Sequence, residues 1–413
     1  MRAGQARGWK PIYRRPTAAP SAAFPPRRAA SSASAPRLSE ELRAIVETEL
    51  EPGQLMSIEA YAGAGKSTAL LEYAKRHPDL RTLYVVFNKS VQEDQEERYE
   101  ALGLKHVKVM TLDGYAFSAT MDWHEGNVVE DYNLDVDLVR GETCALRLQG
   151  IRNTLDTFLA SADVEMTVKH CAGVQGMNFY EALNIADFVY QQRPIDQPPT
   201  FSMVTKYFQI THASTRRHGY DLVMIDEAHD CTPAQLAALM AMPSTRRIIV
   251  YDRHQTINEW RRSVAAEDLA NLTTTYVRPL TMSWRFGDDV ADAARRSIRF
   301  LDPACESEVA IRGSPSKKSV VRTYDDLSLA VASLAEAETR LVVLARNNAT
   351  LISTAYKLVR RYPELASEVR FQSGGPFAHL GACNCTKMVA ALCTCRVWKA
   401  CLDARRGEVP DVC

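Results

Sequence analysis

Residues 60–67 combine small residues, a lysine and a serine in a spacing that suits phosphate binding. The segment reads Ala-Tyr-Ala-Gly-Ala-Gly-Lys-Ser. Gly63 and Gly65 permit backbone angles that turn successive N–H groups inward, which forms an anion-binding nest at the start of a helix. Lys66 would then reach the β- and γ-phosphates of a nucleotide, and the Ser67 hydroxyl is a ligand for Mg²⁺. The segment predicts an ATP site with the binding residues Gly63, Ala64, Gly65, Lys66, Ser67 and Thr68.

Two adjacent acidic residues, Asp226 and Glu227, follow the apolar run Leu222–Ile225. Such a run predicts a buried strand that delivers both carboxylates to the carboxyl edge of a parallel sheet, where open α/β sheets bind ligands. Neighbouring carboxylates repel each other and favour a cation between or beside them. We therefore predict that Asp226 holds Mg²⁺ together with Ser67, and that Glu227 orients and deprotonates the attacking water.

Two later segments place polar residues behind short apolar runs. Gln255 follows the run Ile248–Tyr251 and is predicted to sense the γ-phosphate or to position water. Trp260 offers a stacking face to a single-stranded base, and the alternative is an ordinary core or interface aromatic. Arg285 lies between two aromatic residues in Ser-Trp-Arg-Phe-Gly, and its planar guanidinium suits phosphate recognition, although a plain surface arginine is the alternative.

Short apolar runs alternate with helical patterns along much of the chain. This alternation predicts a parallel α/β sheet covered by helices on both faces. A separate helical pattern begins at the predicted N-cap Ser39, and another begins near Lys66. Residues 121–215 lack strand-like runs and are interpreted as a mainly helical insertion, with helices over Cys144–Leu159 and Phe179–Gln191. The runs expected to form strands are Leu55–Ala60, Leu83–Phe87, Leu222–Ile225, Ile248–Tyr251 and Leu341–Ala345.

Composition bounds the class of protein. The chain has 413 residues and is 46% hydrophobic, which excludes collagen-like, wholly disordered and disulfide-stapled miniprotein classes. No apolar run approaches the length of a membrane-spanning helix, so no membrane partner is expected. Lys and Arg total 50, as do Asp and Glu, yet residues 1–38 hold eight basic and no acidic residues. Those first residues are expected to be disordered, and they also resemble an organelle transit peptide.

In their order, these four elements resemble the UvrD/Rep-like branch of superfamily 1 DNA helicases, and most closely the eukaryotic F-box DNA helicase family. Residues 84–92, 111–117 and 344–349 resemble further motifs of that family. Residues 226–233 read Asp-Glu-Ala-His-Asp-Cys-Thr-Pro and differ from the family's pattern only at the histidine. The resemblance covers about residues 38–375 and is specific as a set.

The resemblance implies an α/β fold: a RecA-like P-loop NTPase sheet with a helical insertion and an incomplete second RecA-like lobe. It also implies ATP between the lobes, single-stranded DNA across them, movement from 3′ to 5′, and a nuclear role with protein partners in DNA repair. An organelle such as the mitochondrion is the alternative location. By motif position, ATP catalysis would use Glu227, Lys66, Gln255 and Arg285. The DNA-facing residues would be Asn88, Lys89, Thr111, Trp260 and Arg261.

We predict five parts for the chain. Residues 1–37 form a tail rich in Arg, Ala, Pro and Ser, and residues 121–215 form the insertion. The remaining parts are a first ATPase lobe over 38–120 and 216–285, a partial second lobe over 286–375, and a Cys-rich segment over 376–413.

The sequence departs from the family's pattern in places that bear on activity. Ala60 replaces the first glycine of the phosphate loop, and His229 replaces a glutamine that couples ATP to DNA. Asp113 stands in place of a histidine, where a carboxylate would repel phosphate. Tyr251 and Asn258 replace a glycine and a base-stacking tyrosine. These changes are expected to weaken coupling more than nucleotide binding.

The last segment leaves alternatives open. After Gly375 the family's motifs V and VI are not found, which predicts C-terminal truncation, as in a truncated or mis-spliced gene model. The alternative for the six cysteines after residue 382 is a tetrahedral zinc site. The main functional hypothesis is an ATP-dependent DNA helicase or translocase. Its alternative is a nucleotide-dependent DNA-binding or adaptor protein without motor activity.

Overall fold

The structure is a computed structural model of the chain, and its contacts divide it into two units, Met1–Ser319 and Val320–Cys413. The predicted tail, the predicted strand Leu341–Ala345 and the Cys-rich segment lie outside the described residues, as do Trp260 and Arg261. All the helices and strands named below belong to the first unit. The structure describes residues 38–129, 144–175, 177–191, 198–215, 219–243, 245–256, 262–301, 310–321, 353–355, 357 and 360.

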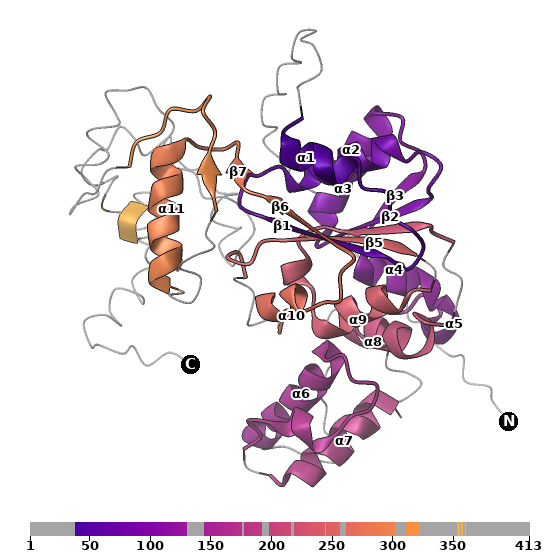
Figure 1. The fold of residues 1–413 in the computed structure, drawn as a ribbon. Helices are drawn as coiled ribbons and strands as arrows, with labels where there is room; N and C mark the ends of the chain where they lie inside the picture. Colours follow the sequence, from indigo (N-terminus) through magenta and orange to yellow (C-terminus); the bar gives the residue numbers. More distant parts are fainter. Residues whose placement is uncertain are drawn as a thin grey trace, which may run out of the picture. The chain divides into compact units, whose positions relative to one another are not determined.

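A six-stranded parallel sheet forms the centre of the first unit (Figure 1). The order across the sheet is β3-β2-β4-β5-β1-β6, and every neighbouring pair is parallel. This confirms the predicted α/β fold, and four of the strands match predicted runs to within two residues. The strands are β1 (Leu55–Ala60), β2 (Thr82–Val86), β3 (Val107–Thr111), β4 (Leu222–Ile225), β5 (Arg246–Tyr251) and β6 (Tyr276–Leu280).

Alternating side chains along the strands build two separate cores, because successive residues of a strand point to opposite faces. Met56 and Ile58 of β1 enter one core with helices α1 (Glu40–Val46), α2 (Lys66–Arg76) and α3 (Lys89–Ala101). Leu55 enters the other core, which contains residues of α4, α8 and α9. Figure 1 shows these two groups of helices on opposite faces of the sheet. The bounds of the second group are Leu112–Ala119, Phe201–Thr211 and Pro233–Ala241.

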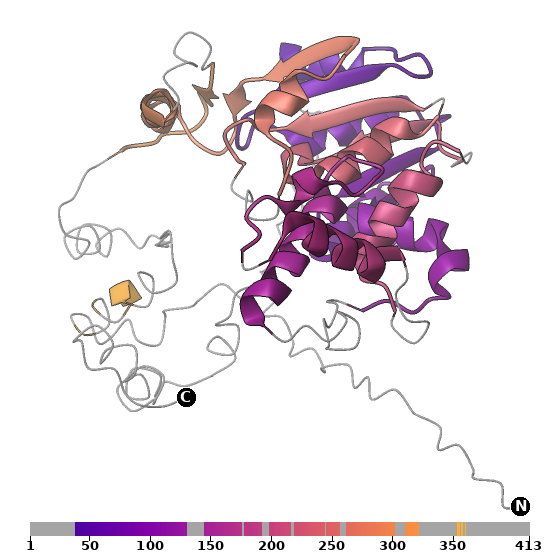
Figure 2. The same ribbon diagram turned by 90° about the horizontal axis from the view of Figure 1, so that it is seen from below.

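The regular elements described in the insertion are all helices, apart from an isolated bridge between Val129 and Thr200. Its helices α6 and α7 confirm the predicted helical patterns and share a third core. α6 also contacts α8 and α9, so the insertion lies against one face of the sheet (Figure 2). The elements are α5 (Met121–His124), α6 (Ala145–Ala160), η1 (Val168–Cys171) and α7 (Phe179–Gln191).

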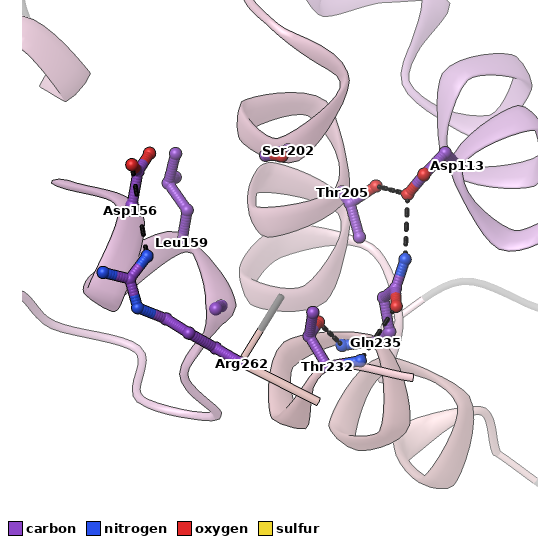
Figure 3. A pocket seen from close by; sticks show the side chains of 9 residues that line it. Asp113, Asp156, Leu159, Ser202, Thr205, Thr232, Gln235 and Arg262 are labelled. Atoms are coloured by element: carbon purple, nitrogen blue, oxygen red, sulfur yellow. Dashed lines mark hydrogen bonds and ion pairs between the residues drawn. The ribbon is translucent and has the colours of Figure 1, made fainter. Parts of the chain in front are cut away.

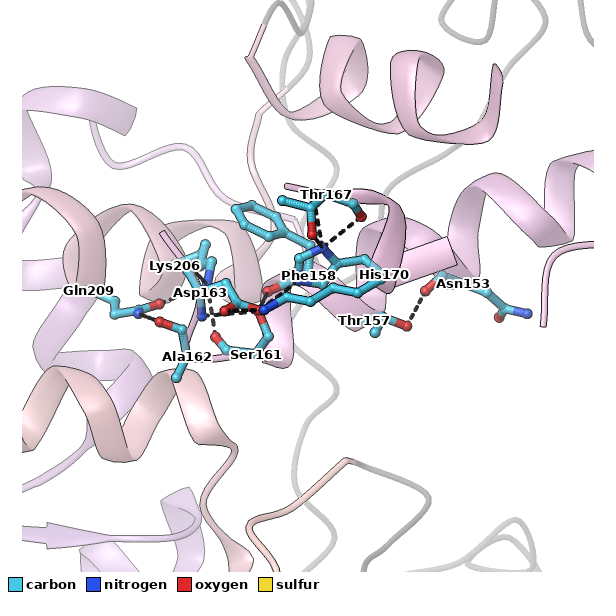
Figure 4. A network of polar contacts seen from close by, with 11 residues as sticks. Asn153, Thr157, Phe158, Ser161, Ala162, Asp163, Thr167, His170, Lys206 and Gln209 are labelled. Carbon is cyan, nitrogen blue, oxygen red and sulfur yellow. Dashed lines mark hydrogen bonds and ion pairs between the residues drawn. The ribbon is translucent and has the colours of Figure 1, made fainter. Parts of the chain in front are cut away.

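A fully buried lysine joins α8 to the end of α6. The Lys206 ammonium donates to the Ser161 carbonyl at 2.8 Å, to the Asp163 carbonyl, and to the Gln209 Oε1 at 2.9 Å. It also lies 4.4 Å from the ring centre of Phe158 (Figure 4). Carbonyls after a helix C-terminus attract cations, and an ammonium carries three donors, so Lys206 is fully hydrogen-bonded here.

Short capping signals set several helix starts. Ser39 accepts from the Leu42 N–H and begins α1, as predicted. Thr232 and Gln235 form a reciprocal capping box at α9, with Pro233 as its first residue. After β6, the first unit also contains a separate two-stranded parallel sheet formed by β7 and β8. The remaining elements are α10 (Ala266–Ala270), β7 (Met282–Ser283), α11 (Asp288–Leu301) and β8 (Arg312–Gly313), while η2 (Ala228–Asp230) lies between β4 and α9.

Candidate nucleotide site

The predicted phosphate loop joins the carboxyl end of β1 to the start of α2. Gly63 and Gly65 have φ angles of 75° and 98°, a region that favours glycine. The Ala64 N–H donates to the Tyr61 carbonyl at 3.0 Å and closes the turn. Gly65 is the residue that caps α2, so the loop opens onto a helix N-terminus, where backbone N–H groups and the helix dipole favour an anion.

Arg285 lies directly against this loop. A Cβ atom at Gly63 would stand 2.5 Å from the Arg285 Cγ, so only glycine leaves room for the arginine stem. The Trp284 N–H donates to the Gly63 carbonyl at 2.9 Å, and the Ser283 hydroxyl donates to the Ala62 carbonyl at 2.8 Å. The segment predicted from Ser-Trp-Arg-Phe-Gly is therefore bonded to the phosphate loop, and it holds an exposed guanidinium beside it.

Ser67 and Asp226 meet although they stand 159 positions apart in the chain. The Ser67 hydroxyl donates to the Asp226 Oδ2 at 3.0 Å, and the Glu227 N–H donates to Oδ1 at 3.1 Å. The hydroxyl of Tyr84 donates to the same Oδ2 at 2.8 Å. A buried carboxylate beside a hydroxyl is the hard oxygen donor set that Mg²⁺ prefers, so the two predicted ligands fit the ion. Tyr84 was not predicted, because a tyrosine in an apolar run looks like core packing.

Lys66, which is buried, and Glu227, which is partly exposed, form an ion pair with unmet hydrogen-bonding capacity. The Lys66 Nζ lies 2.8 Å from the Glu227 Oε2. Among the described residues, neither atom has a partner with hydrogen-bond angles. An anionic phosphate at the loop would supply the acceptors that the ammonium lacks. An unsatisfied ammonium at the start of a helix that follows a glycine-rich loop therefore favours a binding role for this pair.

The backbone and the electrostatics of Glu227 are both unusual. Its φ of 50° and ψ of 48° lie in the left-handed region, which costs a non-glycine residue about 1–3 kcal/mol. Burial raises the pKa of its carboxyl, the Lys66 ammonium opposes that rise, and Asp226 adds to it. A strained carboxylate with a raised pKa at a sheet edge is the arrangement expected of a general base.

His229 links this carboxylate to the segment that carries Gln255. The Asp252 N–H donates to the His229 Nδ1 at 3.2 Å, so Nδ1 is an acceptor and the ring proton lies on Nε2. That Nε2 stands 3.6 Å from the Glu227 Oε2. The Gln255 amide donates to the Asp252 carboxylate. Glu227 and Gln255, both predicted to serve ATP, are thus connected through two buried residues, the His229 side chain and Asp252.

The structure gives the predicted DNA-facing residues mixed surroundings. Asn88 caps α3 by accepting from the Val91 N–H at 2.9 Å, and Thr111 caps α4 by accepting from the Gly114 N–H at 3.1 Å. Lys89 is exposed at the first residue of α3. These three residues follow or end β2 and β3, at the same sheet edge as the phosphate loop. A DNA contact by any of them stays a prediction.

The Asp113 carboxylate is hydrogen-bonded by residues of two other helices, α8 and α9. Its Oδ1 accepts from the Thr205 hydroxyl at 2.7 Å and from the Gln235 amide at 3.1 Å (Figure 3). These bonds tie α4 to α8 and α9 and occupy the carboxylate. Arg262 and Asp156 face each other at 4.0 Å across the same pocket. The pocket has a volume of about 190 Å³ and is lined by Asp113, Asp156, Leu159, Ala160, Ser202, Thr205, Thr232, Gln235 and Arg262.

Comparison with known proteins places this geometry among named relatives. No protein family model matches the chain. The chain is 28% identical over 290 residues to "F-box DNA helicase protein 1" of Schizosaccharomyces pombe, covering 62% of this chain and 32% of that protein. It is 27% identical over 286 residues to "F-box DNA helicase 1" of Gallus gallus, covering 63% of this chain and 28% of that one. The chain thus spans about a third of the length of these relatives.

The comparisons and the sheet indicate the same kind of fold. A parallel six-stranded sheet with a phosphate loop after β1 and an acidic pair after β4 fits a RecA-like P-loop helicase fold. The described helices include none that is both long and apolar enough to span a bilayer. Over the matched region, this chain is similar in sequence to these two F-box DNA helicases.

Proposed function

We propose that this chain is an ATP-dependent DNA helicase or translocase, and that the site around Lys66 binds Mg-ATP. The observation that carries the proposal is the meeting of two distant motifs at one sheet edge. Ser67 lies 3.0 Å from Asp226, and Lys66 lies 2.8 Å from Glu227. Two such contacts between a glycine-rich loop and an acidic pair are the parts that phosphoryl-transfer sites share.

Each side chain has a role in this proposal that follows from its position. Lys66 and the backbone N–H groups of the loop bind the phosphates. Ser67 and Asp226 hold Mg²⁺, which would shield phosphate charge when bound. Glu227 orients a water and accepts its proton, and its connection through His229 and Asp252 fixes its place relative to Gln255. The stem of Arg285 packs against Gly63, so its guanidinium would be available to the outermost phosphate.

The finer parts of the proposal concern DNA. We propose single-stranded DNA as the partner, with Asn88, Lys89, Thr111, Trp260 and Arg261 facing it and with movement from 3′ to 5′. We further propose a role in DNA repair and a location in the nucleus. The nuclear location is supported by the names and eukaryotic sources of the two relatives. The organelle alternative gains no support from them. The proposed lobes and insertion keep the predicted boundaries.

ATP hydrolysis by the full chain tests the proposal. Turnover is measured with and without single-stranded DNA, beside Lys66→Ala and the matched control Lys75→Ala. Lys75 lies on the same helix and pairs at the surface with Glu72 at 2.7 Å. DNA-stimulated turnover that disappears in Lys66→Ala and persists in Lys75→Ala supports the proposal. Unwinding of duplexes with a 3′ or a 5′ tail then determines the direction of movement.

A second function has one observation in its favour. Asn88 and Thr111, two of the predicted DNA-facing residues, use their side chains as helix caps. A nucleotide-dependent DNA-binding or adaptor protein needs no motor coupling through those residues. Lys66-dependent ATP binding without DNA-stimulated turnover in the same experiment would favour this second function over a motor.

A further inference from the structure

A tyrosine in the middle of β2 makes a polar contact that the motifs do not explain. Tyr84 is fully buried and stands within the apolar strand Thr82–Val86. Its hydroxyl donates to the Asp226 Oδ2 at 2.8 Å, across 142 positions of sequence. β2 and β4 are neighbours in the sheet, and Tyr84 is paired in register with Met224. The tyrosine therefore reaches Asp226 along the sheet surface from the adjacent strand.

Burial alone does not require this hydrogen bond. Tyr73 and Tyr99 belong to the same core as Tyr84, and both bury a hydroxyl that has no hydrogen-bond partner among the described residues. The ring of Tyr99 even packs against that of Tyr84, with centres 5.4 Å apart. This core accommodates a tyrosine ring without satisfying its hydroxyl. The bond from Tyr84 to Asp226 is consequently a property of this one tyrosine.

The bond also holds the carboxylate in one orientation. Oδ2 of Asp226 accepts from both Ser67 and Tyr84, while Oδ1 accepts from the Glu227 N–H. A tyrosine hydroxyl is protonated at neutral pH, so Tyr84 is the donor in this bond and the carboxylate is the acceptor. Ser67 is itself a proposed Mg²⁺ ligand, whereas the oxygen of Tyr84 is not. Tyr84 is thus the side-chain donor from outside the phosphate loop that, with the Glu227 N–H, holds the carboxylate.

We propose that Tyr84 is a positioning residue for Mg²⁺: its hydroxyl aligns the Asp226 carboxylate with the Ser67 hydroxyl. The proposal rests on the proposed function and adds a residue to its metal-binding part. Groups that hydrogen-bond to a metal ligand commonly change metal affinity or activity by about 10–100-fold when removed. A residue with a purely structural role would instead change folding stability and leave the metal dependence unaltered.

The test compares Tyr84→Phe with Tyr99→Phe in the full chain. Both changes delete one buried hydroxyl from the same core, but only the first deletes a bond to Asp226. A fluorescent ADP analogue is titrated in excess Mg²⁺ and again in EDTA, and the ratio of the two affinities is the readout. Urea unfolding of each variant checks the fold. We expect Tyr84→Phe to lower the ratio about tenfold and Tyr99→Phe to leave it at the wild-type value.

Three outcomes would overturn the proposal, each in its own way. An unchanged ratio in Tyr84→Phe would show that the hydroxyl does not position the ligand. Equal weakening in Mg²⁺ and in EDTA would assign Tyr84 a structural role. If the wild-type chain binds the analogue equally well with and without Mg²⁺, the metal part of the proposed function falls and this inference falls with it. Titration of Mn²⁺ by its paramagnetic resonance signal, with ADP present, gives the same comparison without turnover.

Discussion

Two buried lysines in this molecule are used in opposite ways. Lys66 lies at the start of α2, and its Nζ is 2.8 Å from the Glu227 carboxylate. The angles of this contact do not meet those of a hydrogen bond, so the ammonium has no hydrogen-bond partner among the described residues. Lys206 lies on α8 and donates three hydrogen bonds, two to backbone carbonyls and one to Gln209. The Lys66 ammonium can therefore still donate hydrogen bonds to a ligand, whereas all three donors of Lys206 are bonded within the fold.

The difference separates a binding site from a structural joint. Leaving a buried donor without an acceptor costs about 1–3 kcal/mol and more for a charged group, so a phosphate at the loop would remove a cost that the Lys66 ammonium otherwise carries. Lys206 shows that this chain satisfies a buried ammonium where no ligand is needed. Its pKa is lowered to about 8 by burial, with Asp163 acting in the opposite direction. Substituting each lysine should therefore harm different properties.

The largest effect is expected from Lys66→Ala. Loss of the ammonium removes the charge that stabilises the phosphates during transfer, and deleting one such group commonly costs about 100–1000-fold in turnover. Steady-state ATP hydrolysis measures this loss. Urea unfolding should change by less than about 1 kcal/mol, because no hydrogen bond of good geometry is lost. A large loss of stability with retained turnover would make Lys66 a second structural lysine and end the contrast.

Lys206→Met is expected to reverse that pattern. Methionine fills much of the same volume but leaves two carbonyls and an amide oxygen without their buried donor. We expect a loss of about 3 kcal/mol in the free energy of unfolding, measured in urea. Nucleotide affinity of the folded fraction should match the wild type. Unchanged stability would mean that the acceptors find other donors, and the network of Figure 4 would then not join α8 to the insertion.

The two lysines also mark how far the sequence alone reaches. Lys66 lies in a contiguous motif whose glycines, lysine and serine each have a local reason, so its local structure was predictable, while its role in phosphate binding stays a prediction. The strands carrying that motif and the acidic pair were predictable too, because they are short apolar runs. The weakly apolar strand β3 and the strand β6, which contains Pro279, were missed.

Contacts between distant residues were not predictable from one sequence. Asp113 looked like a repulsive group beside DNA, yet Thr205 and Gln235 bind its carboxylate from other helices. His229 looked like a lost coupling residue, yet it accepts from Asp252 and faces Glu227. The sequence shows that these residues are charged or polar, but their partners lie far along the chain: Gln235 is 122 positions from Asp113, and Asp252 is 23 positions from His229. Only the packing of the sheet and helices determines such pairs.

Gly63→Ala tests whether the loop that precedes Lys66 serves catalysis through its contact with Arg285. Both Gly63 and Gly173 have positive φ angles, 75° and 83°, so alanine at either position strains the backbone similarly. A Cβ at Gly63 would overlap the Arg285 stem, whereas nothing lies within 4 Å of a Cβ at Gly173 in the insertion. We expect both variants to lose about 1 kcal/mol of stability. Only Gly63→Ala should also lose turnover, by about tenfold.

That experiment has a direct control. Nucleotide binding is measured in parallel, because a displaced Arg285 lowers turnover while a distorted loop lowers affinity as well. Equal ATP hydrolysis by Gly63→Ala and Gly173→Ala would show that the packing of Arg285 on the loop has no role in catalysis.

The smallest effect concerns pH and the partner of Lys66. Burial raises the pKa of Glu227 above its ordinary value of 4.5, and Lys66 opposes the rise. A general base works only when ionised, so turnover should fall as the pH drops through that raised pKa. The acid limb of turnover at saturating ATP should therefore lie above 4.5, whereas nucleotide affinity should not share it. Glu227→Gln, which should bind nucleotide without turning it over, separates the two properties.

An acid limb at or below 4.5 would contradict the assignment of Glu227 as the base. A matching limb in nucleotide affinity would transfer the titration to the phosphate contacts. Either result would mean that Lys66 acts on the phosphates without the help of an ionised Glu227.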